Sequence, residues 1–324
     1  MNTFGKIFRL SIFGESHGSC VGITLDGVPC GIEINENDFI DDLLRRKTGK
    51  KGTSTRLESD KPEIISGMFN GYTTGAPLTI IFKNINIDSS DYEIIKEFSR
   101  PGHSDFTASR KFDGFNDYRG GGHFSGRLTL PLVAAGVVAK KIIPNIKISA
   151  KIISLKGEKN IDEIINKTIE KKDSVGGIIE CRASEIPVGF GEPFFDSVES
   201  VISHLVFSIP GIKGIEFGAG FAAASMYGSQ HNDMFENSEG KTKTNNSGGI
   251  SGGITNGNEL IFRVTVKPTP SIGLPQKSFN FKTNKIEEFE ISGRHDICFA
   301  LRLPVVIEAV TAIVLADFFA RNKN

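Results

Sequence analysis

The sequence lacks net charge, because 38 Lys and Arg residues are balanced by 38 Asp and Glu residues. A protein that binds nucleic acid or anionic membranes over a broad surface needs a basic excess, so the balance argues against both kinds of partner. The other proportions, 39% hydrophobic and 23% charged, are typical of a soluble globular protein. The length of 324 residues is enough for a large core.

Cysteine and long hydrophobic runs are also scarce. The four cysteines form no C-x-x-C pair, and a chain of this length needs no disulfide framework, so we expect free thiols in a reducing compartment. The N-terminus shows no apolar signal segment. The longest apolar stretch, Val305 to Phe319, is interrupted by Glu308 and Asp317 and is too short and polar to span a bilayer. The sequence predicts a cytoplasmic protein without a membrane segment.

Glycine, by contrast, is abundant. The 36 glycines make up about 11% of the chain, against an average of about 7%. Many of them lie with polar residues in two long segments, Arg100 to Gly126 and Gly228 to Gly253. Loops of this length in a compact domain tend to be functional.

Hydrophobic periodicity predicts strands and helices in mixed order. Leu128 to Ile143 is apolar on almost every side, the pattern of a buried helix, and Pro131 fits its first turn. The elements do not alternate as regular βαβ units, which predicts an α+β fold, and a similar run of elements after about Asp173 suggests an internal duplication. The other expected strands are Lys6–Phe13, Val21–Leu25, Glu63–Phe69, Leu78–Lys83, Ile146–Ile153, Gly177–Arg182, Ile212–Phe217 and Leu260–Val266. The other expected helices are Glu36–Lys47, Ile161–Lys172, Asp196–Ser208 and Phe299–Arg321, the last interrupted at Pro304.

Histidines and cations mark the candidate site. His204 falls in an amphipathic helical pattern and is expected to be structural. The other five histidines lie in polar, glycine-containing or acidic surroundings that suit proton transfer. These are His17, His103, His123, His231 and His295.

The Lys and Arg residues are clustered along the chain, which in a neutral protein favours a small anionic ligand, because arginine binds phosphate and carboxylate through paired hydrogen bonds. The alternative for the first cluster is a helix end that complements its dipole. The clusters are Arg45, Arg46, Lys47, Lys50 and Lys51, then Arg100, Arg110, Arg119 and Arg127, and later Lys267 and Arg294.

Parts of the sequence also fit two other enzyme classes. The segment Gly14 to Gly18 matches the G-x-S-x-G nucleophile elbow of α/β-hydrolases, which would make Ser16 a nucleophile. Only thirteen residues precede the segment, whereas such elbows lie well inside the chain. A catalytic metal site would use as ligands His103, Asp105, His295 and Asp296. These residues lack the i, i+4 spacing of helical metal ligands. A binding module without catalysis would not need so many histidines in glycine loops.

Seven motifs follow one another along the chain. They are Phe13-Gly14-Glu15-Ser16-His17-Gly18, Asp26-Gly27-Val28-Pro29, Arg100-Pro101-Gly102-His103-Ser104-Asp105, Asp117-Tyr118-Arg119-Gly120-Gly121-Gly122, Gly248-Gly249-Ile250-Ser251-Gly252-Gly253-Ile254, Lys267-Pro268-Thr269 and Gly293-Arg294-His295-Asp296. Any single motif is unspecific, but the ordered set along the whole chain is specific. With these motifs the chain resembles the chorismate synthase family, from Gly5 to about Asp317.

The resemblance implies a carbon–oxygen lyase that makes chorismate from 5-enolpyruvylshikimate 3-phosphate by anti-1,4-elimination of phosphate and a ring proton. This is the last step of the shikimate pathway to aromatic amino acids. The resemblance also implies reduced FMN as cofactor without net redox change, no metal, and a homotetramer. The expected subunit is one β-α-β sandwich domain, residues 1–324, with internal pseudo-symmetry.

The family's functional positions can be carried over by motif. By resemblance, His17 manages the protonation of the flavin, His103 helps the phosphate leave, and Asp296 works with flavin N5 to remove the ring proton. The flavin-binding positions are His123, Phe124, Ser125, Gly252, Lys267, Pro268, Thr269, Pro270, Ser271 and Arg294. The positions for substrate or nucleotide are Arg46, Lys51, Arg100 and Arg127.

The sequence departs from the family after the triple glycine. The commoner pattern there is Arg-Ser-Ser-Ala-Arg-Glu-Thr, whereas residues 123–129 read His-Phe-Ser-Gly-Arg-Leu-Thr. This departure bears on the first flavin contacts more than on the activity, since histidine can replace arginine as a donor without being equivalent to it. Because no nicotinamide-binding unit is visible, we expect an external flavin reductase as partner, with NADPH as an indirect reductant.

Overall fold

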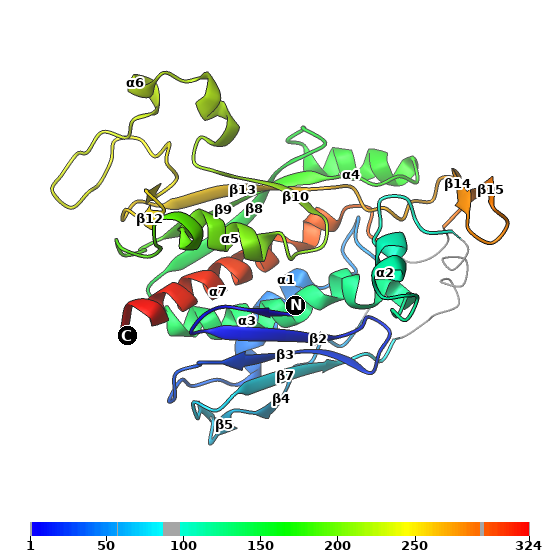
Figure 1. Cartoon of the computed structure of the whole chain (residues 1–324), viewed down its shortest axis with the longest axis horizontal. Helices are drawn as coiled ribbons and strands as arrows, with labels where there is room; N and C mark the ends of the chain where they lie inside the picture. The colour runs from blue at the N-terminus through cyan, green and yellow to red at the C-terminus, as the bar shows by residue number, and fades with distance from the viewer. Residues whose placement is uncertain (1, 57, 87–97, 292–294, 324) are drawn as a thin grey trace.

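Two antiparallel β-sheets enclose a layer of helices (Figure 1). The computed structural model describes residues 2–56, 58–86, 98–291 and 295–323. The layers give a β-α-β sandwich, and the α+β class predicted from the sequence is confirmed. Buried residues of both sheets and of the central helices form one continuous hydrophobic core.

The first sheet has the strand order β1-β2-β3-β7-β4. In β3, Val21, Ile23 and Leu25 are fully buried on one face, whereas Cys20, Thr24 and Asp26 on the other face are partly exposed, as a sheet with one face on the core requires. The strands are β1 (Thr3–Phe4), β2 (Arg9–Gly14), β3 (Cys20–Asp26), β7 (Leu78–Lys83) and β4 (Glu63–Ser66). A small hairpin of β5 (Met68–Phe69) and β6 (Tyr72–Thr73) lies between β4 and β7 in the chain.

The N-terminal strand differs from its prediction. A single strand was expected over Lys6–Phe13, but the chain turns between β1 and β2. Gly5 has a φ of +95°, and the backbone N–H groups of residues 6, 7 and 8 donate to the carboxylate of Asp317. This carboxylate, which is completely buried, therefore fixes a turn that strand propensity alone does not indicate.

The second sheet has the order β10-β13-β9-β8. Helix α4 (Ile161–Glu170) covers its outer face (Figure 1). The strands are β10 (Ile212–Phe217), β13 (Leu260–Val266), β9 (Gly177–Ser184) and β8 (Lys147–Leu155).

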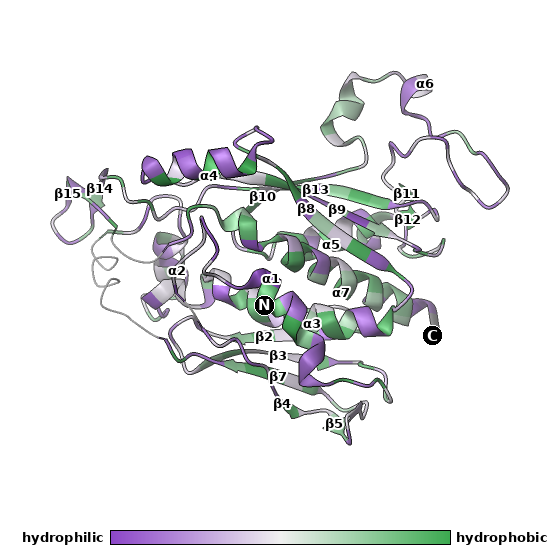
Figure 2. Cartoon of the chain, turned by 180° about the vertical axis from the view of Figure 1, so that it is seen from behind, coloured by the Kyte–Doolittle hydropathy of each residue, from purple (hydrophilic) through white to green (hydrophobic). Residues whose placement is uncertain are grey.

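The middle layer is built around α3 (Thr129–Ile142) and α7 (Pro304–Lys323). Helix α3 packs against α7 and the first sheet, while α7 also packs against β8 of the second sheet. Figure 2 shows these helices as largely hydrophobic ribbon, which confirms the buried helix predicted after Leu128. Pro304 begins α7 rather than interrupting a longer helix, because proline is tolerated in a first turn and not in a helix interior.

The two halves of the chain share a plan. Each half supplies one sheet and ends in one long central helix, and each helix follows a 3₁₀ turn, η4 (Gly126–Leu128) or η7 (Phe299–Arg302). The helices α3 and α7 begin at the same end of the sandwich (Figure 1). The polar loops that precede the helices therefore meet there, in agreement with the expected internal duplication.

The remaining elements are short. Two loops expected to be irregular contain α2 (Asp105–Lys111) with η3 (Arg119–Phe124), and α6 (Gly228–His231) with β11 (Ile250–Ser251). Strand β11 pairs with β12 (Ile254–Thr255). The hairpin of β14 (Gln276–Asn280) and β15 (Lys285–Phe289) had not been predicted. The others are η1 (Glu36–Phe39), α1 (Ile40–Arg46), η5 (Phe194–Asp196), α5 (Val198–Val206) and η6 (Gly220–Ser225). None of the described helices is long and apolar enough to span a lipid bilayer.

Candidate active site

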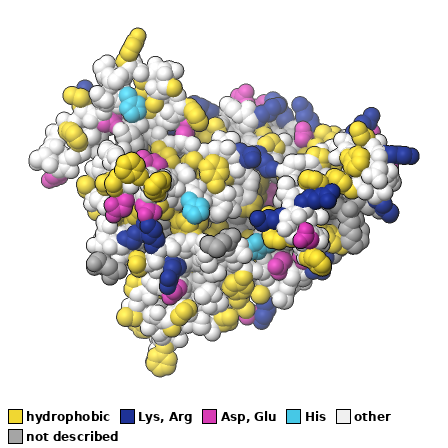
Figure 3. Space-filling model, in the orientation of Figure 1, with side chains coloured by type: hydrophobic (Ala, Val, Ile, Leu, Met, Phe, Trp, Pro, Cys, Tyr) yellow, Lys and Arg dark blue, Asp and Glu magenta, His cyan; other side chains and the backbone are white. Residues whose placement is uncertain are grey.

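A cavity of about 680 Å³ lies where the central helices begin. Residues of the first sheet, of η3 and η4, of α5 and of the segment after β13 all line it. Its size falls within the range of pockets that bind small molecules, about 300–1,000 Å³. Figure 3 shows Lys and Arg side chains around a hollow near the middle of this face of the molecule.

One wall carries the group of Arg100, His103 and Asp105. Arg100 donates from Nε to Asp105 Oδ2 at 2.7 Å and from Nη2 to Oδ1 at 2.8 Å. His103 Nδ1 lies 2.6 Å from Asp105 Oδ1. Burial by itself raises the pKa of Asp105, but hydrogen bonds from Arg100 and His103 outweigh it and hold this pKa well below its ordinary value.

The environment of His103 favours a neutral imidazole. Burial lowers the pKa of His103, and the charges of Arg100 and Lys267 lower it further, although Asp105 acts in the opposite direction. A histidine with a pKa below 6.5 is mostly uncharged at pH 7. With Nδ1–H donated to the Asp105 carboxylate, Nε2 of the neutral imidazole carries only a lone pair, and it lies 3.3 Å from Arg100 Nη2.

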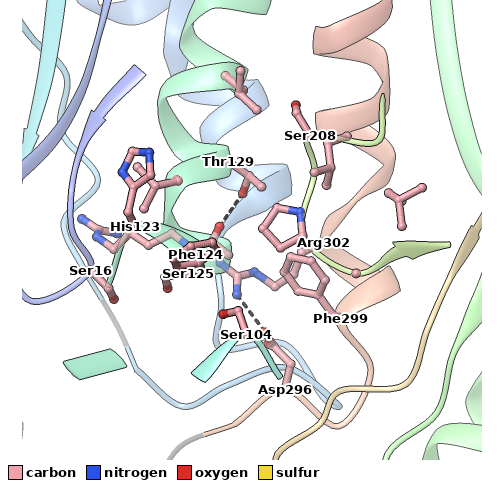
Figure 4. Close-up of a pocket in the computed structure, with 18 of the residues that line it drawn as sticks. Ser16, Ser104, His123, Phe124, Ser125, Thr129, Ser208, Asp296, Phe299 and Arg302 are labelled. Carbon is pink, nitrogen blue, oxygen red and sulfur yellow. Dashed lines mark hydrogen bonds and ion pairs between the residues drawn. The ribbon is translucent and has the colours of Figure 1, made fainter. Parts of the chain in front are cut away.

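Asp296 lies three residues before η7, and both of its carboxylate oxygens accept hydrogen bonds. Oδ1 accepts from the backbone N–H of Ser54 at 2.8 Å, and Oδ2 pairs with Arg302 Nη1 at 3.0 Å. Figure 4 shows this ion pair beside Phe299. Arg302 also donates from Nε to the carbonyl of Arg46 at 3.2 Å. The contacts join the start of the last helix to the end of α1 and orient Asp296.

Ser16 is held by an arginine. Arg56 donates from Nη1 to Ser16 Oγ at 3.1 Å and from Nη2 to Glu58 Oε1 at 2.6 Å. Ser16 is 1% exposed, and Arg56 and Glu58 both line the cavity. Burial raises the pKa of Glu58, but its hydrogen bonds to Arg56 and Ile85 prevail and lower it. Ser16 is therefore fixed as a hydrogen-bonding group beside a cation.

His17 is not among the described residues that line the cavity. Its buried ring lies against Gly120, which does line it: a Cβ added to Gly120 would be 2.5 Å from His17 Cδ2. Gly120 has a φ of +58°. Both the close approach and the left-handed backbone therefore require glycine at this position.

Hydrogen bonds from Asn84, which is itself bound by Arg127, hold the loop that contains His17. Asn84 Nδ2 donates to the carbonyls of Glu15 at 3.0 Å and Gly18 at 2.8 Å. Asn84 Oδ1 accepts from Arg127 Nε at 2.6 Å, and Arg127 Nη1 pairs with Asp60 at 2.7 Å. Arg127 thus acts on the loop through Asn84.

Arg46 also donates its hydrogen bonds to groups of the protein. Its Nε donates to Thr129 Oγ1 at 3.0 Å and its Nη2 donates to the carbonyl of Gly126 at 3.0 Å. The side chain is 1% exposed and still lines the cavity. It stabilises the turn that begins α3 and gives the cavity wall positive charge.

The segment Lys267–Ser271 forms a further wall. The ammonium of Lys267 donates to the carbonyl of Gly102, and Ser271 Oγ accepts from Arg100 Nη1 at 3.2 Å. Thr269 Oγ1 is buried without a hydrogen-bond partner among the described residues. A buried hydroxyl that lacks a partner costs about 1–3 kcal/mol, so this atom suits a ligand.

The segment that departs from the family pattern also reaches the cavity. His123, Phe124 and Ser125 all line it. His123 Nδ1 lies 2.8 Å from the carbonyl of Gly14, so the imidazole ties η3 to the end of β2. Phe124 is 38% exposed and offers an apolar surface.

Some sequence-predicted residues lie elsewhere. Gly252 is in the β11–β12 hairpin and Lys51 is exposed; neither is among the described residues that line the cavity. Arg294 lies outside the described residues. No group of three or more His, Cys, Asp or Glu side chains suited to a metal ion occurs in the described part of the chain.

Other cavity residues were not singled out from the sequence. Arg56, Lys213 and Arg302 all line it. Arg302 follows the Gly-Arg-His-Asp motif by six residues, and a search for cations near each motif would have found it. Lys213 stands in an ordinary strand pattern that gives no such signal.

Comparisons with known proteins agree along the whole chain. A family model described as chorismate synthase matches residues 8–320. A chorismate synthase of Chitinophaga pinensis is 59% identical over 100% of this chain and 98% of its own length, and one of Dehalococcoides mccartyi is 45% identical over 99% and 97%. A crystal structure of chorismate synthase matches with a TM-score of 0.74 and 25% identity, covering 98% of this chain and 93% of the other.

Proposed function

This chain belongs to the chorismate synthase family and is a carbon–oxygen lyase, and from that premise we propose that it converts 5-enolpyruvylshikimate 3-phosphate to chorismate by anti-1,4-elimination. In this reaction the C–O bond to phosphate and a ring C–H bond break, and a new ring double bond forms. The products are chorismate, inorganic phosphate and a proton, without net oxidation.

The observation that carries the proposal is the excess of cations around the cavity. Among the described lining residues, seven Lys or Arg side chains face three carboxylates. The substrate carries a phosphate and two carboxylates, and a partly buried cavity strengthens its attraction to cations because water is excluded. The cavity is also half apolar, which suits a flat aromatic ring beside the anion.

The residues present fit reduced FMN. Lys267, Thr269 and Ser271 would hold it, and the unpartnered hydroxyl of Thr269 supports this assignment. Reduced FMN, when bound, supplies electron density that helps expel the phosphate and takes it back afterwards. The protein's part is to bind both molecules together and exclude water.

Arg100 and His103 are assigned to the leaving phosphate. Asp105 fixes both side chains through hydrogen bonds, so they need no reorientation during the reaction. In the ligand-free protein the single N–H of the neutral His103 ring is held by Asp105. A phosphate anion beside the ring would raise the pKa of His103, and the Nε2–H of the imidazolium could then donate to a phosphate oxygen as the C–O bond breaks.

Asp296 is assigned to the ring proton and His17 to proton control at the flavin. Asp296 lines the cavity and its orientation is fixed by Ser54 and Arg302. His17 would act from behind Gly120, which lines the cavity and has no side chain to separate the ring further from it. Arg46 and Arg127 support the site through their protein contacts.

We also propose a domain organisation, an oligomeric state and a source of reduced flavin. The main hydrophobic core, which both sheets and the central helices share, supports one domain over residues 1–324. We expect a homotetramer in the cytoplasm, supplied with reduced flavin by an external reductase that draws on NADPH. Gly252, Lys51 and Arg294 stay proposed binding residues.

The test is anaerobic phosphate release from 5-enolpyruvylshikimate 3-phosphate, with and without reduced FMN. We expect release and chorismate absorbance only when reduced FMN is present. Reaction without flavin would contradict the proposal. Labelling of Ser16 by a fluorophosphonate would favour a serine hydrolase, and loss of activity with a chelator would favour a metal enzyme.

A further inference from the structure

Strand β10 carries one extra residue at the edge of the cavity. Ile212 pairs with Val266 and Gly214 pairs with Thr265, so Lys213 has no opposite residue on β13. The side chains of β10 show the same irregularity. Ile212 and Ile215 both pack against the core although they are three residues apart, whereas side chains on one face of a regular strand are two residues apart. A β-bulge of this kind redirects a side chain and is frequent next to active sites.

The bulged residue Lys213 lines the cavity and is exposed. The structure gives it no ion pair with any described carboxylate. Lys267, on the neighbouring strand's continuation, also lines the cavity and likewise has no described carboxylate partner. Lys213 and Lys267 directly follow the paired residues Ile212 and Val266 of the adjacent strands. Burial lowers the pKa of Lys267, and the positive charge of Lys213 lowers it further.

This arrangement differs from that of the other cavity cations. Arg56, Arg100 and Arg302 each pair with a carboxylate of the protein. Two like charges without an acidic neighbour cost free energy in the ligand-free protein. A dianion between them would remove the repulsion and gain two charge-assisted hydrogen bonds.

We propose that Lys213, presented by the β10 bulge, binds together with Lys267 the phosphate monoester of a ligand in this cavity. The inference rests on the proposed function, which supplies two such ligands, FMN and 5-enolpyruvylshikimate 3-phosphate. The assignment of Lys213 is independent of the motifs, since it follows from the strand register and the cation pair. Lysine suits this role because it contacts phosphate as a compact charge.

The test compares Lys213→Met and Lys213→Arg with the unaltered full-length protein. Dissociation constants for FMN and for riboflavin, which lacks the phosphate, are measured by flavin fluorescence at low ionic strength. The Michaelis constant for 5-enolpyruvylshikimate 3-phosphate is measured with saturating reduced FMN. If Lys213 binds the flavin phosphate, Lys213→Met weakens FMN by about 10- to 100-fold and leaves riboflavin unchanged. If it binds the substrate phosphate, the Michaelis constant rises by a similar factor and the FMN constant does not change.

Lys213→Arg keeps the charge. It should therefore bring the affected constant, the FMN dissociation constant or the Michaelis constant, most of the way back to that of the unaltered protein. Lys151→Met is the matched control, an exposed lysine of the same sheet that is absent from the described cavity lining, and it should change neither constant. Equal weakening of FMN and riboflavin, or no change in either arm, would overturn the assignment. Failure of the unaltered protein to bind flavin or release phosphate would instead refute the proposed function.

Discussion

Individual side chains in the cavity derive their chemical state from their immediate neighbours. His103 and Asp105 share one hydrogen bond, yet both have lowered pKa values, the first mainly through burial and the second through hydrogen bonds that outweigh burial. The pair therefore consists of a neutral imidazole and a carboxylate at pH 7. Ser16 is a hydrogen-bond partner of Arg56, which assigns it to positioning rather than to nucleophilic attack.

Replacing Ser16 and His17 separately tests these roles. Ser16→Ala removes one hydrogen bond to Arg56 and should keep much of the activity. His17→Ala should lower turnover by about 10²- to 10⁴-fold, the usual contribution of a general acid or base. Initial rates of anaerobic phosphate release measure both variants. An inactive Ser16→Ala together with an active His17→Ala would reverse the assignment.

Asp296→Asn tests the proton acceptor. The amide keeps the shape of the carboxylate and can still accept from Ser54 N–H, so FMN and substrate should bind nearly as before. Turnover should fall by about 10²- to 10⁴-fold. Flavin fluorescence and single-turnover kinetics separate the two effects. Parallel losses of binding and turnover would identify Asp296 as a structural partner of Arg302.

Among the secondary-structure elements, the contact between α3 and α7 determines how the two halves meet. A Cβ added to Gly136 would lie 2.3 Å from the Cβ of Ala309 and 2.5 Å from its Cα. The two helix backbones approach closely at this point because neither residue has a large side chain. The loops at the beginning of both helices form the cavity, so its shape depends on this crossing.

Gly136→Val should therefore destabilise the protein. The added side chain has no space between α3 and α7, and overpacking of a core costs about 1–3 kcal/mol. Thermal unfolding followed by circular dichroism should show a lower Tm. The control is Gly228→Ala at the start of α6, where an added Cβ meets no atom within 4 Å, and its stability should be unchanged. Equal Tm values for Gly136→Val and the unaltered protein would show that the helices can separate at no cost.

The molecule as a whole brings together distant chain segments at one end of the sandwich. Thr48 and Ser54, Gly120, Lys267 and Asp296 come from separate parts of the chain and line one cavity. The described residues that line the cavity include more Lys and Arg than Asp and Glu, and a bound anion would neutralise this excess. Binding of substrate and flavin should therefore draw the segments together and exclude water.

Limited trypsin digestion tests this closure. Cleavage after Lys50, Lys51 and Arg119 should be fast without ligands and strongly suppressed when FMN and 5-enolpyruvylshikimate 3-phosphate are both present. Lys241 provides an internal control, because its exposed side chain lies in another segment, and its cleavage should not change. Unchanged cleavage at the first three sites, with bound flavin verified by fluorescence, would show that these segments do not close over the ligands.

The sequence by itself determined the family and the fold class, and it pointed to candidate residues of which most line one cavity, because ordered motifs and hydrophobic periodicity are local properties of the chain. The central helix after Leu128 could be predicted from its uniform hydrophobicity. The tertiary structure alone decided which groups meet: Arg302 with Asp296, Asn84 with the His17 loop, and Asp317 with the turn after β1. The register shift that presents Lys213 likewise depends on pairing between β10 and β13, strands about fifty residues apart. Such contacts join distant segments, and their free energy depends on packing, which no local pattern records.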